Sequence, residues 1–265
     1  MGRLDGKIAI VTGAAPRGEG VGNGKAMAIL MAREGARVLL VNRSAARAEE
    51  LAEEIAAEGG EASVFAADVT NTDEVAAMGA TVQERYGRLD ILCNNVGIGA
   101  GAGPNRVEDV TDETWDNLYD VNMTSAMKCS RVAVPLMRDS GGGGSIINIS
   151  SIAGSLGLMG SPGAAAYAAT KSGVHGLTLS IAADYATELI RCNCIIIGSV
   201  NTPMVARLGE DGRARRKKMV PMQTEGTGWD IGWAAVYLAS DEAQWVTGVM
   251  LPVDGGLNAL RAWPR

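Results

Sequence analysis

The 265-residue sequence has few of the residues that metal, disulfide or nucleic-acid chemistry requires. It contains one His, four Cys without a C-x-x-C pair, and 30 acidic residues against 24 basic ones. A lone His and scattered Cys offer no cluster of metal ligands. A net charge of -6 disfavours a nucleic-acid or anionic-membrane surface. We therefore expect reduced thiols in the cytoplasm, no metal site and no nucleic-acid or membrane partner.

Long hydrophobic runs are also missing, and aromatic residues make up only 4% of the chain. The first residues, MGRLDGKIAIV, contain too short an apolar run for a signal peptide or a membrane span. The chain is instead rich in Gly, with 35 residues, which suits helices packed closely on an aliphatic sheet. These features predict one domain over residues 1–265 that acts on a small molecule.

Short apolar runs alternate with helical patterns along the chain. We expect strands at 7–13, 37–43, 61–70, 89–97, 145–151 and 191–197, and helices at 25–34, 44–60, 73–86, 113–137, 165–188 and 229–238. Helices between successive strands imply right-handed crossovers and a parallel sheet that is covered on both faces. The sequence therefore predicts an α/β fold with a Rossmann-like, doubly wound parallel sheet.

The stretch TGAAPRGEGVGNGKAMA, residues 12 to 28, joins the first expected strand to the first expected helix. A strand, a glycine-rich turn and a helix form a dinucleotide-binding unit, because glycines let the pyrophosphate approach and the helix amino terminus offers unpaired N–H groups. By itself this pattern is also compatible with a methyltransferase or with a structural loop.

Six further segments follow in order: DV at 68–69, NNVG at 94–97, DVNM at 120–123, ISS at 149–151, YAATK at 167–171 and VTGVMLPVDGG at 246–256. Together with the glycine-rich turn, this series resembles the short-chain dehydrogenase/reductase family over nearly the whole chain. The resemblance implies an NAD(P)-dependent oxidoreductase that interconverts a secondary alcohol and a ketone. The alternative is an inactive NAD(P)-binding regulator or scaffold, which would predict damaged Ser, Tyr, Lys or Asn positions, and all four are intact.

The expected chemistry needs a hydride carrier and a group that moves a proton at the substrate oxygen. Tyr167 and Lys171 are four residues apart, so they share a helix face, and the ammonium should lower the pKa of the phenol. The resemblance implies that Tyr167 is the acid/base and that Lys171 also binds the nicotinamide ribose. It also implies that Ser151 hydrogen-bonds the substrate oxygen and that Asn122 holds a water. Ser150 is the competing serine.

The cofactor residues are also implied by the resemblance. Besides Tyr167 and Lys171 they are Gly13, Gly22, Gly24, Asn42, Arg43, Asp68, Val69, Asn95, Gly97, Gly198, Val200 and Thr202. At the end of the second strand Asn42 stands where a carboxylate would favour NAD, and Arg43 can bind the extra phosphate of NADP. We therefore favour NADP over NAD. In the alternative, Arg43 only caps the loop and Asn42 hydrogen-bonds the ribose, and NAD would then be an acceptable cofactor.

Three segments depart from the family pattern. At one of them Ile197 replaces the Pro that the family usually has before Gly198, which permits more movement of that turn. The glycine-rich turn has five extra residues if Gly13 is read with Gly22 and Gly24, the favoured register, and one extra if it is read with Gly18 and Gly20. The insertion is either a solvated loop or a means for Arg17 to reach a phosphate. The segment GSPGAAA before Tyr167 lengthens the interval after Ser151 and should border the substrate.

Residues 204–228 are the expected substrate lid. Their apolar members suit an adaptable hydrophobic pocket and are Met204, Leu208, Met219 and Met222. Their basic members are expected to form a solvated helix face rather than an anion site and are Arg213, Arg215, Arg216, Lys217 and Lys218.

A homotetramer is also implied by the resemblance, with the helices at 113–137 and 165–188 paired across a two-fold axis. Val174, Leu177 and Ile181 mark an apolar stripe on the second helix, and the small residues expected to face a partner are Ala182, Ala183 and Ala186. His175 is expected to be a packing or interface residue, and Trp263 is a candidate anchor for a second interface.

Overall fold

The computed structural model describes residues 2–99, 106–156 and 164–259, and it confirms the α/β prediction. Seven parallel strands form one sheet in the order β3-β2-β1-β4-β5-β6-β9. The strands are β1 (Ile8–Thr12), β2 (Arg37–Asn42), β3 (Glu61–Ala66), β4 (Ile91–Asn94), β5 (Gly144–Ser151), β6 (Ile190–Ile197) and β9 (Met250–Val253). Two short strands, β7 (Val200–Asn201) and β8 (Gly226–Thr227), pair separately. The strand order reverses between β1 and β4, as it does in doubly wound folds.

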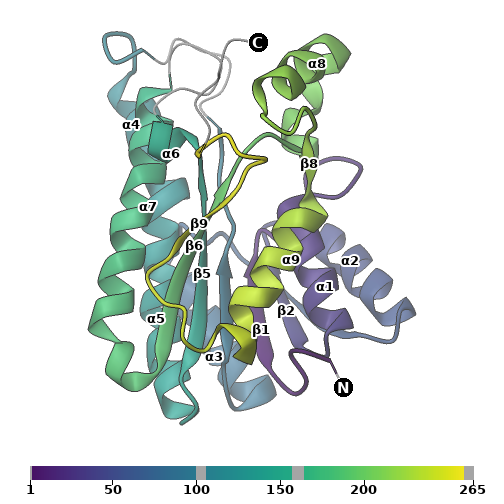
Figure 1. Cartoon of the computed structure of the whole chain (residues 1–265). Coiled ribbons are helices and arrows are strands. Elements are labelled where there is room, and N and C mark those ends of the chain that lie inside the picture. The colour runs from purple at the N-terminus through teal and green to yellow at the C-terminus, as the bar shows by residue number, and fades with distance from the viewer. Residues whose placement is uncertain (1, 100–105, 157–163, 260–265) are drawn as a thin grey trace.

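Helices cover both faces of the sheet (Figure 1). One face packs against α1 (Asn23–Arg33), α2 (Ala45–Ala57) and α9 (Gly228–Ala239), and the other packs against α3 (Thr72–Tyr86), α5 (Ser125–Asp139) and α7 (Ala165–Asp184). The remaining α-helices of the described residues are α4 (Asp112–Tyr119), α6 (Ala153–Leu156) and α8 (Gly209–Met219). Each face buries an aliphatic layer, so the sheet is a rigid platform for groups at its edges.

Two of the differences from the sequence-based expectation concern the site and the main sheet. The helix expected at 113–137 is α4, a π-helical turn at Asp120–Thr124, and α5 in succession. A π turn adds a residue to the helical repeat, and here it carries Asn122. Strand β9 was not predicted, because its four residues are only partly buried and include Pro252. Prolines are confined to sheet edges and bulges, and β9 is indeed an edge strand.

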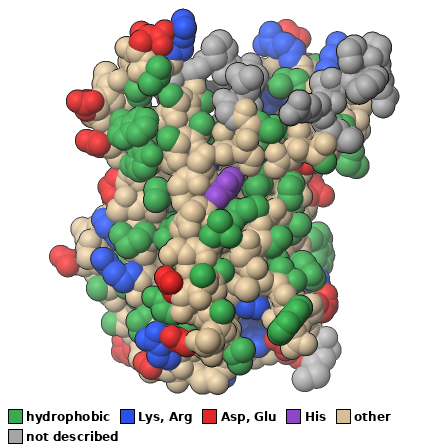
Figure 2. All heavy atoms as spheres, turned by 60° about the vertical axis from the view of Figure 1, so that its left-hand side comes forward, with side chains coloured by type: hydrophobic (Ala, Val, Ile, Leu, Met, Phe, Trp, Pro, Cys, Tyr) green, Lys and Arg blue, Asp and Glu red, His purple; other side chains and the backbone are tan. Residues whose placement is uncertain are grey.

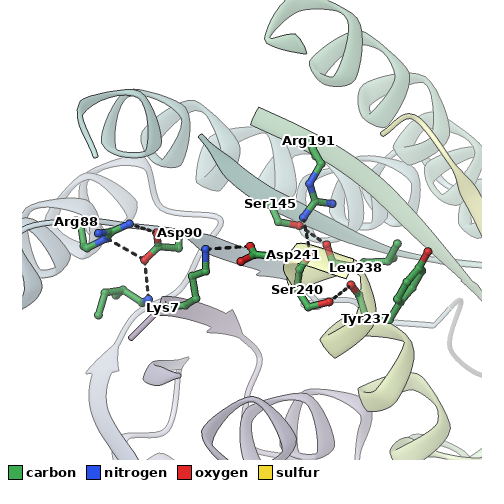
Figure 3. A network of polar contacts seen from close by, with 10 residues as sticks. Lys7, Arg88, Asp90, Ser145, Arg191, Tyr237, Leu238, Ser240 and Asp241 are labelled. Atoms are coloured by element: carbon green, nitrogen blue, oxygen red, sulfur yellow. Dashed lines mark hydrogen bonds and ion pairs between the residues drawn. The ribbon is translucent and has the colours of Figure 1, made fainter. Parts of the chain in front are cut away.

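A polar network links the elements at the end of the sheet where the strands begin (Figure 3). The buried carboxylate of Asp90 accepts hydrogen bonds from the Ile8 backbone N–H at 2.8 Å and from Arg88 Nε at 3.1 Å. Ser145 in β5 donates to the carbonyl of Leu238 at 2.9 Å, which joins the sheet to the end of α9. These contacts lie at the edge opposite to the candidate site, so their role is to fix the sheet.

The candidate site residues lie at the carboxyl edge. Ser151 ends β5, and Gly13, Gly97 and Gly198 follow β1, β4 and β6. No helix among the described residues is long and apolar enough to cross a membrane.

Candidate active site

Three elements bring the four expected catalytic residues together. Ser151 is the last residue of β5, Tyr167 and Lys171 lie in the first turns of α7, and Asn122 lies on the π-helical turn. A Cβ placed on Gly97 would lie 3.3 Å from Asn122 Oδ1 and 3.4 Å from Lys171 Nζ. Asn122 and Lys171 therefore converge on the same point beyond β4.

The Asn122 side chain is held on both sides. Its Oδ1 accepts a hydrogen bond from the Ile98 backbone N–H at 2.7 Å, and its Nδ2 donates to the Ile98 carbonyl at 3.0 Å. Nδ2 also lies 3.3 Å from the hydroxyl of Thr170, which is fully buried on α7. The π turn is therefore fastened both to the loop after β4 and to the helix that carries Tyr167.

Lys171 is a buried cation at the centre of this group. Its side chain is 4% exposed, and Nζ donates a hydrogen bond to the Ile149 carbonyl at 2.9 Å. Burial lowers the pKa of Lys171 to about 8. Desolvation favours the neutral amine, because water no longer stabilises the charge.

The pKa of Tyr167 differs from the sequence-based expectation. Burial raises the pKa of this phenol, and hydrogen bonding with Ser151 acts in the opposite direction. Lys171 Nζ lies 6.0 Å from the centroid of the Tyr167 ring and is bonded to Ile149, so the expected lowering by the ammonium was wrong for this structure. A phenol with a raised pKa stays protonated at neutral pH and can donate its proton.

Ser150, the competing serine, makes other contacts. Its Oγ donates to the Lys171 carbonyl at 2.9 Å and lies 2.9 Å from His175 Nε2. Because the one hydroxyl proton goes to the carbonyl, His175 must donate from Nε2. His175 is partly buried, and Figure 2 shows the single imidazole at the surface of the face formed by α7 and its neighbours. This geometry favours Ser151 over Ser150 as the partner of Tyr167.

The glycine-rich turn fits the diphosphate of a dinucleotide. A Cβ on Gly24 would lie 2.2 Å from the Gly13 carbonyl oxygen, and Gly13 has a φ of 63°. Helix α1 starts directly after Gly22, with no side-chain cap and no acidic residue in its first turn. The amino terminus of α1 can therefore receive an anion. Asn23 Oδ1 beside it is buried without a hydrogen-bond partner among the described residues.

The inserted residues of this turn run toward the proposed lid. A Cβ on Gly18 would meet Pro203 at 3.5 Å, and one on Gly20 would meet it at 3.9 Å. Arg17 lines a hollow of about 370 Å³ between the turn and α2, and its other charged lining residues are Lys25, Arg47, Glu19, Glu50 and Glu54. Both Arg17 interpretations, solvated or phosphate-binding, are compatible with this position.

The adenosine end of the expected site lies beyond β2. Arg43 Nη1 is 3.4 Å from Asp68 Oδ2, and Asn42 Nδ2 donates to the Ser44 carbonyl at 3.1 Å. Burial acts to raise the pKa of Asp68, but hydrogen bonds from Thr70 and Arg43 outweigh it and the net pKa is lowered. Val69, the neighbour of Asp68, is buried. The carboxylate is therefore ionised at neutral pH and holds Arg43 beside the end of β2.

The part of the expected site that would face the nicotinamide is built from tightly packed backbone. A Cβ on Gly198 would lie 2.5 Å from Asp254, so a side chain does not fit there. Val200 is buried in β7, and Thr202 directly precedes the helical turn that begins the lid segment. Asn95 Nδ2 donates to the carbonyls of Thr12 and Gly13 at 3.1 and 3.0 Å, which joins the ends of β1 and β4.

Part of the expectation for the lid was wrong. Arg216 is mostly buried and Arg213 is half-exposed, and both contact the buried carboxylate of Glu225. They do not belong to a solvated face, whereas Arg215, Lys217 and Lys218 are exposed. The burial of Glu225 could not be predicted, because a lone Glu in a polar segment carries no signal of burial. Met204, Leu208, Met219 and Met222 are exposed apolar residues.

The remaining expectations concern the segment before Tyr167, Trp263 and metal binding. Most of the GSPGAAA segment and Trp263 lie outside the described residues. Among the residues that the structure describes, no group of three or more His, Cys, Asp and Glu side chains is arranged to hold a metal ion.

Known proteins resemble this chain over nearly its full length. Residues 18–258 match the family model described as Enoyl-(Acyl carrier protein) reductase. A 3beta-hydroxysteroid dehydrogenase of Mediterraneibacter gnavus is 37% identical, over 97% of this chain and 97% of that protein. The 3-oxoacyl-[acyl-carrier-protein] reductase FabG of Thermotoga maritima is 35% identical, over 96% and 99%.

A solved structure extends the likeness to three dimensions. A Burkholderia xenovorans protein assigned to the short-chain dehydrogenases/reductases superposes with a TM-score of 0.92 at 37% identity, covering 99% of this chain and 100% of that one. Sequence and fold thus agree over nearly the full length. The chain belongs to the short-chain dehydrogenase/reductase family and is an NAD(P)-dependent oxidoreductase that interconverts secondary alcohols and ketones.

Proposed function

We propose that Ser151, Tyr167, Lys171 and Asn122 carry out this reaction and that NADP is the preferred cofactor. The observation that carries the proposal is the convergence of these side chains at the carboxyl edge of the sheet, with Lys171 Nζ and Asn122 Oδ1 both facing Gly97. In an open α/β sheet, ligands bind at this edge, beside the point where the strand order reverses.

The role of each residue follows from its protonation state and from the hydrogen bonds that it can make. NAD(P), when bound, supplies or accepts the hydride. In ketone reduction Tyr167 Oη gives its proton to the carbonyl oxygen, and the Ser151 hydroxyl donates a hydrogen bond to the same oxygen. Lys171 binds the nicotinamide ribose and so orients the cofactor beside Tyr167. Asn122 holds a water that returns a proton to the Tyr167 phenol. In alcohol oxidation the proton moves the other way.

The preference for NADP is argued from charge at the end of β2. Asn42 places no negative charge there, and the Arg43 side chain is 55% exposed, so its guanidinium is available to a phosphate. The Asp68 contact is long, at 3.4 Å, and an exposed ion pair of this kind is weak. A phosphate that offers several acceptor oxygens would compete with it.

The substrate side is proposed to be apolar and covered by residues 204–228. This lid segment contains exposed Met204, Met219 and Met222 and stands beyond the carboxyl edge of the sheet (Figure 1). Methionine adapts its shape to different apolar ligands. The relatives named as hydroxysteroid dehydrogenase and 3-oxoacyl reductase suggest cyclic or 3-oxo ketones as the first substrates to try.

Assembly and location complete the proposal. We place a homotetramer interface on the α5 and α7 side, where Leu179, Ala183 and Ala186 are exposed. Val174 and Ile181 of the expected apolar stripe are buried within the chain itself, and so is Ala182, which was expected to face a partner. These three residues therefore pack in the chain's own core. The four cysteines are unpaired and buried, which fits a reducing, cytoplasmic setting.

The proposal is tested by titrating the purified protein with NADPH and with NADH while cofactor fluorescence is followed. A panel of acetoacetyl-coenzyme A, ethyl acetoacetate, a 3-oxosteroid and cyclohexanone then measures cofactor oxidation. We expect tighter NADPH binding and reduction of at least one panel ketone. Tighter binding of NADH would contradict the cofactor preference, and binding without turnover of any ketone would contradict the substrate class.

A further inference from the structure

Glu225 is a buried carboxylate held by two arginines of the proposed lid. Its side chain is 2% exposed. Arg213 Nε donates to Oε2 at 3.0 Å, and Arg216 Nη1 lies 3.3 Å from Oε1. The two arginines are three residues apart on α8, so they project from the same side of the helix. This contact fastens the lid helix to the segment that enters β8.

Arg216 also reaches the nicotinamide end of the proposed cofactor site. Its Nη2 donates a hydrogen bond to the Val200 carbonyl at 3.2 Å. Val200 lies in β7, and β7 pairs with β8, the strand that begins directly after Glu225. The Gly226 N–H of β8 donates a hydrogen bond to the Ser199 carbonyl at 3.0 Å. One guanidinium thus joins the lid, the carboxylate and the backbone beside the proposed reaction centre.

Stability alone is a poor explanation for this arrangement. Removing two opposite charges from water costs about as much as their attraction returns, so apolar side chains of similar size would fasten α8 equally well. The charges add direction, because a planar guanidinium fixes the orientation of each acceptor that it contacts. Arg216 Nη1 and Glu225 Oε1 are both buried without a hydrogen bond in the described part of the chain. The pair can therefore tighten with a small shift of α8.

We infer that Glu225 is a positioning residue, which through Arg216 sets the Val200 backbone against the reacting end of the cofactor and through Arg213 holds the lid over the substrate. The inference rests on the proposed function, because Val200 and residues 204–228 border the reacting groups only if that function is correct. Glu225 itself does not touch the reacting groups and acts through its two arginines.

The test replaces Glu225 with Gln, which keeps the shape and removes the charge. We expect kcat/KM for the panel ketone that the parent reduces fastest to fall by roughly 10- to 100-fold, because small displacements of a bound reactant are costly. The enantiomer ratio of the alcohol formed from ethyl acetoacetate should also fall. The Kd of NADPH should change by less than about threefold, since its adenosine half binds at the end of β2.

A second readout needs no activity. Trypsin can cut α8 after the exposed residues Arg215, Lys217 and Lys218. Cleavage should be about tenfold faster in Glu225→Gln than in the parent, because proteolysis follows the population of the opened lid. Glu84→Gln, at an exposed glutamate on α3 outside the lid, makes the same chemical change elsewhere and should leave cleavage of α8 and the kinetics unchanged.

The outcomes separate this inference from the proposed function. Faster cleavage together with lower kcat/KM and a lower enantiomer ratio supports it. Unchanged kinetics and enantiomer ratio in Glu225→Gln overturn it, whatever happens to thermal stability or cleavage. A parent that reduces no ketone contradicts the proposed function instead, and unchanged cleavage would then overturn the inference as well. If Glu225→Gln does not fold, Arg216→Lys must show the same defects, because it keeps the charge and loses the planar guanidinium that contacts both acceptors.

Discussion

Lys171 illustrates how burial changes a residue that the sequence could only name. Its spacing from Tyr167 predicted a shared helix face, and both residues do lie on α7. The pKa values were not predictable, because they depend on the β5 carbonyl that Nζ contacts and on the water that the surroundings exclude. The same holds for Ser150 and Ser151, whose different partners become visible only in three dimensions.

The lowered pKa of Lys171 has a consequence for stability. The folded-state pKa is about 8 and the ordinary value is 10.5, so between these pH values the unfolded chain binds more protons than the folded one. The Lys171 contribution to the free energy of unfolding should therefore rise with pH across this window, by about 3 kcal/mol. Below about pH 8 Lys171 is charged in both states, so its burial lowers the free energy of unfolding by the full amount.

The measurement is urea unfolding of the parent and of Lys171→Met across this pH range. The difference must be used, because the buried cysteines act in the opposite direction. Burial raises the pKa of Cys93 and Cys129 to about 12, so their contribution to stability is lost as alkaline pH ionises the unfolded thiols. A parent-minus-variant difference that stays flat or falls with pH would contradict the assignment.

Asn42 carries the prediction on cofactor choice. Asn42→Asp should shift the ratio of catalytic efficiencies from NADPH toward NADH by about tenfold or more, because a carboxylate there repels the 2′-phosphate and accepts bonds from an unphosphorylated ribose. Asn117→Asp on the exposed side of α4 makes the same chemical change elsewhere and should leave the ratio unchanged. An unchanged ratio in Asn42→Asp would refute the interpretation of this position.

At the scale of elements, the glycine-rich turn shows what sequence patterns reveal and what they leave open. The favoured register, with Gly22 and Gly24 at the start of the helix, matches where α1 begins and where Gly24 meets Gly13. The path of the insertion toward Pro203 was not predictable, because it depends on a contact with a segment far along the chain. Local patterns also gave no sign of the π turn at Asn122, since no Gly or Pro interrupts residues 113–134 of the expected helix.

The turn can be tested with a pair of glycine substitutions. Gly24→Ala should weaken NADPH binding by at least about tenfold, because its Cβ would lie 2.2 Å from the Gly13 carbonyl and force the amino terminus of α1 away from the phosphates. Gly18→Ala places a Cβ in ordinary contact with Pro203 at 3.5 Å, so binding should stay within about threefold of the parent. Equal losses in the two variants would exclude the favoured register.

At the scale of the whole molecule, the strand and helix alternation was enough to predict the parallel sheet and its covered faces, but not the edge strand β9. The apolar stripe of α7 was harder to assign, because a helix face that packs on its own sheet and one that awaits a partner have the same composition. The structure places Val174 and Ile181 in the chain's own core and leaves Leu179 with 53% of its surface exposed.

Assembly can be tested on that exposed residue. At micromolar concentration we expect sedimentation as a tetramer, and Leu179→Glu should shift the distribution to smaller species because it buries a charge in an apolar contact. Leu189→Glu, at an exposed leucine in the turn after α7, should not. A monomeric and fully active parent would refute the interface and leave the catalytic assignment intact.

The proton donor is the group on which the proposed reaction depends most, and Tyr167→Phe tests it most directly. The ring still fills the same space, so NADPH should bind within a few-fold of the parent. Turnover of the best panel ketone should fall by at least about 100-fold, because the group that delivers the proton is gone. Activity within a few-fold of the parent, with cofactor binding intact, would contradict the central claim.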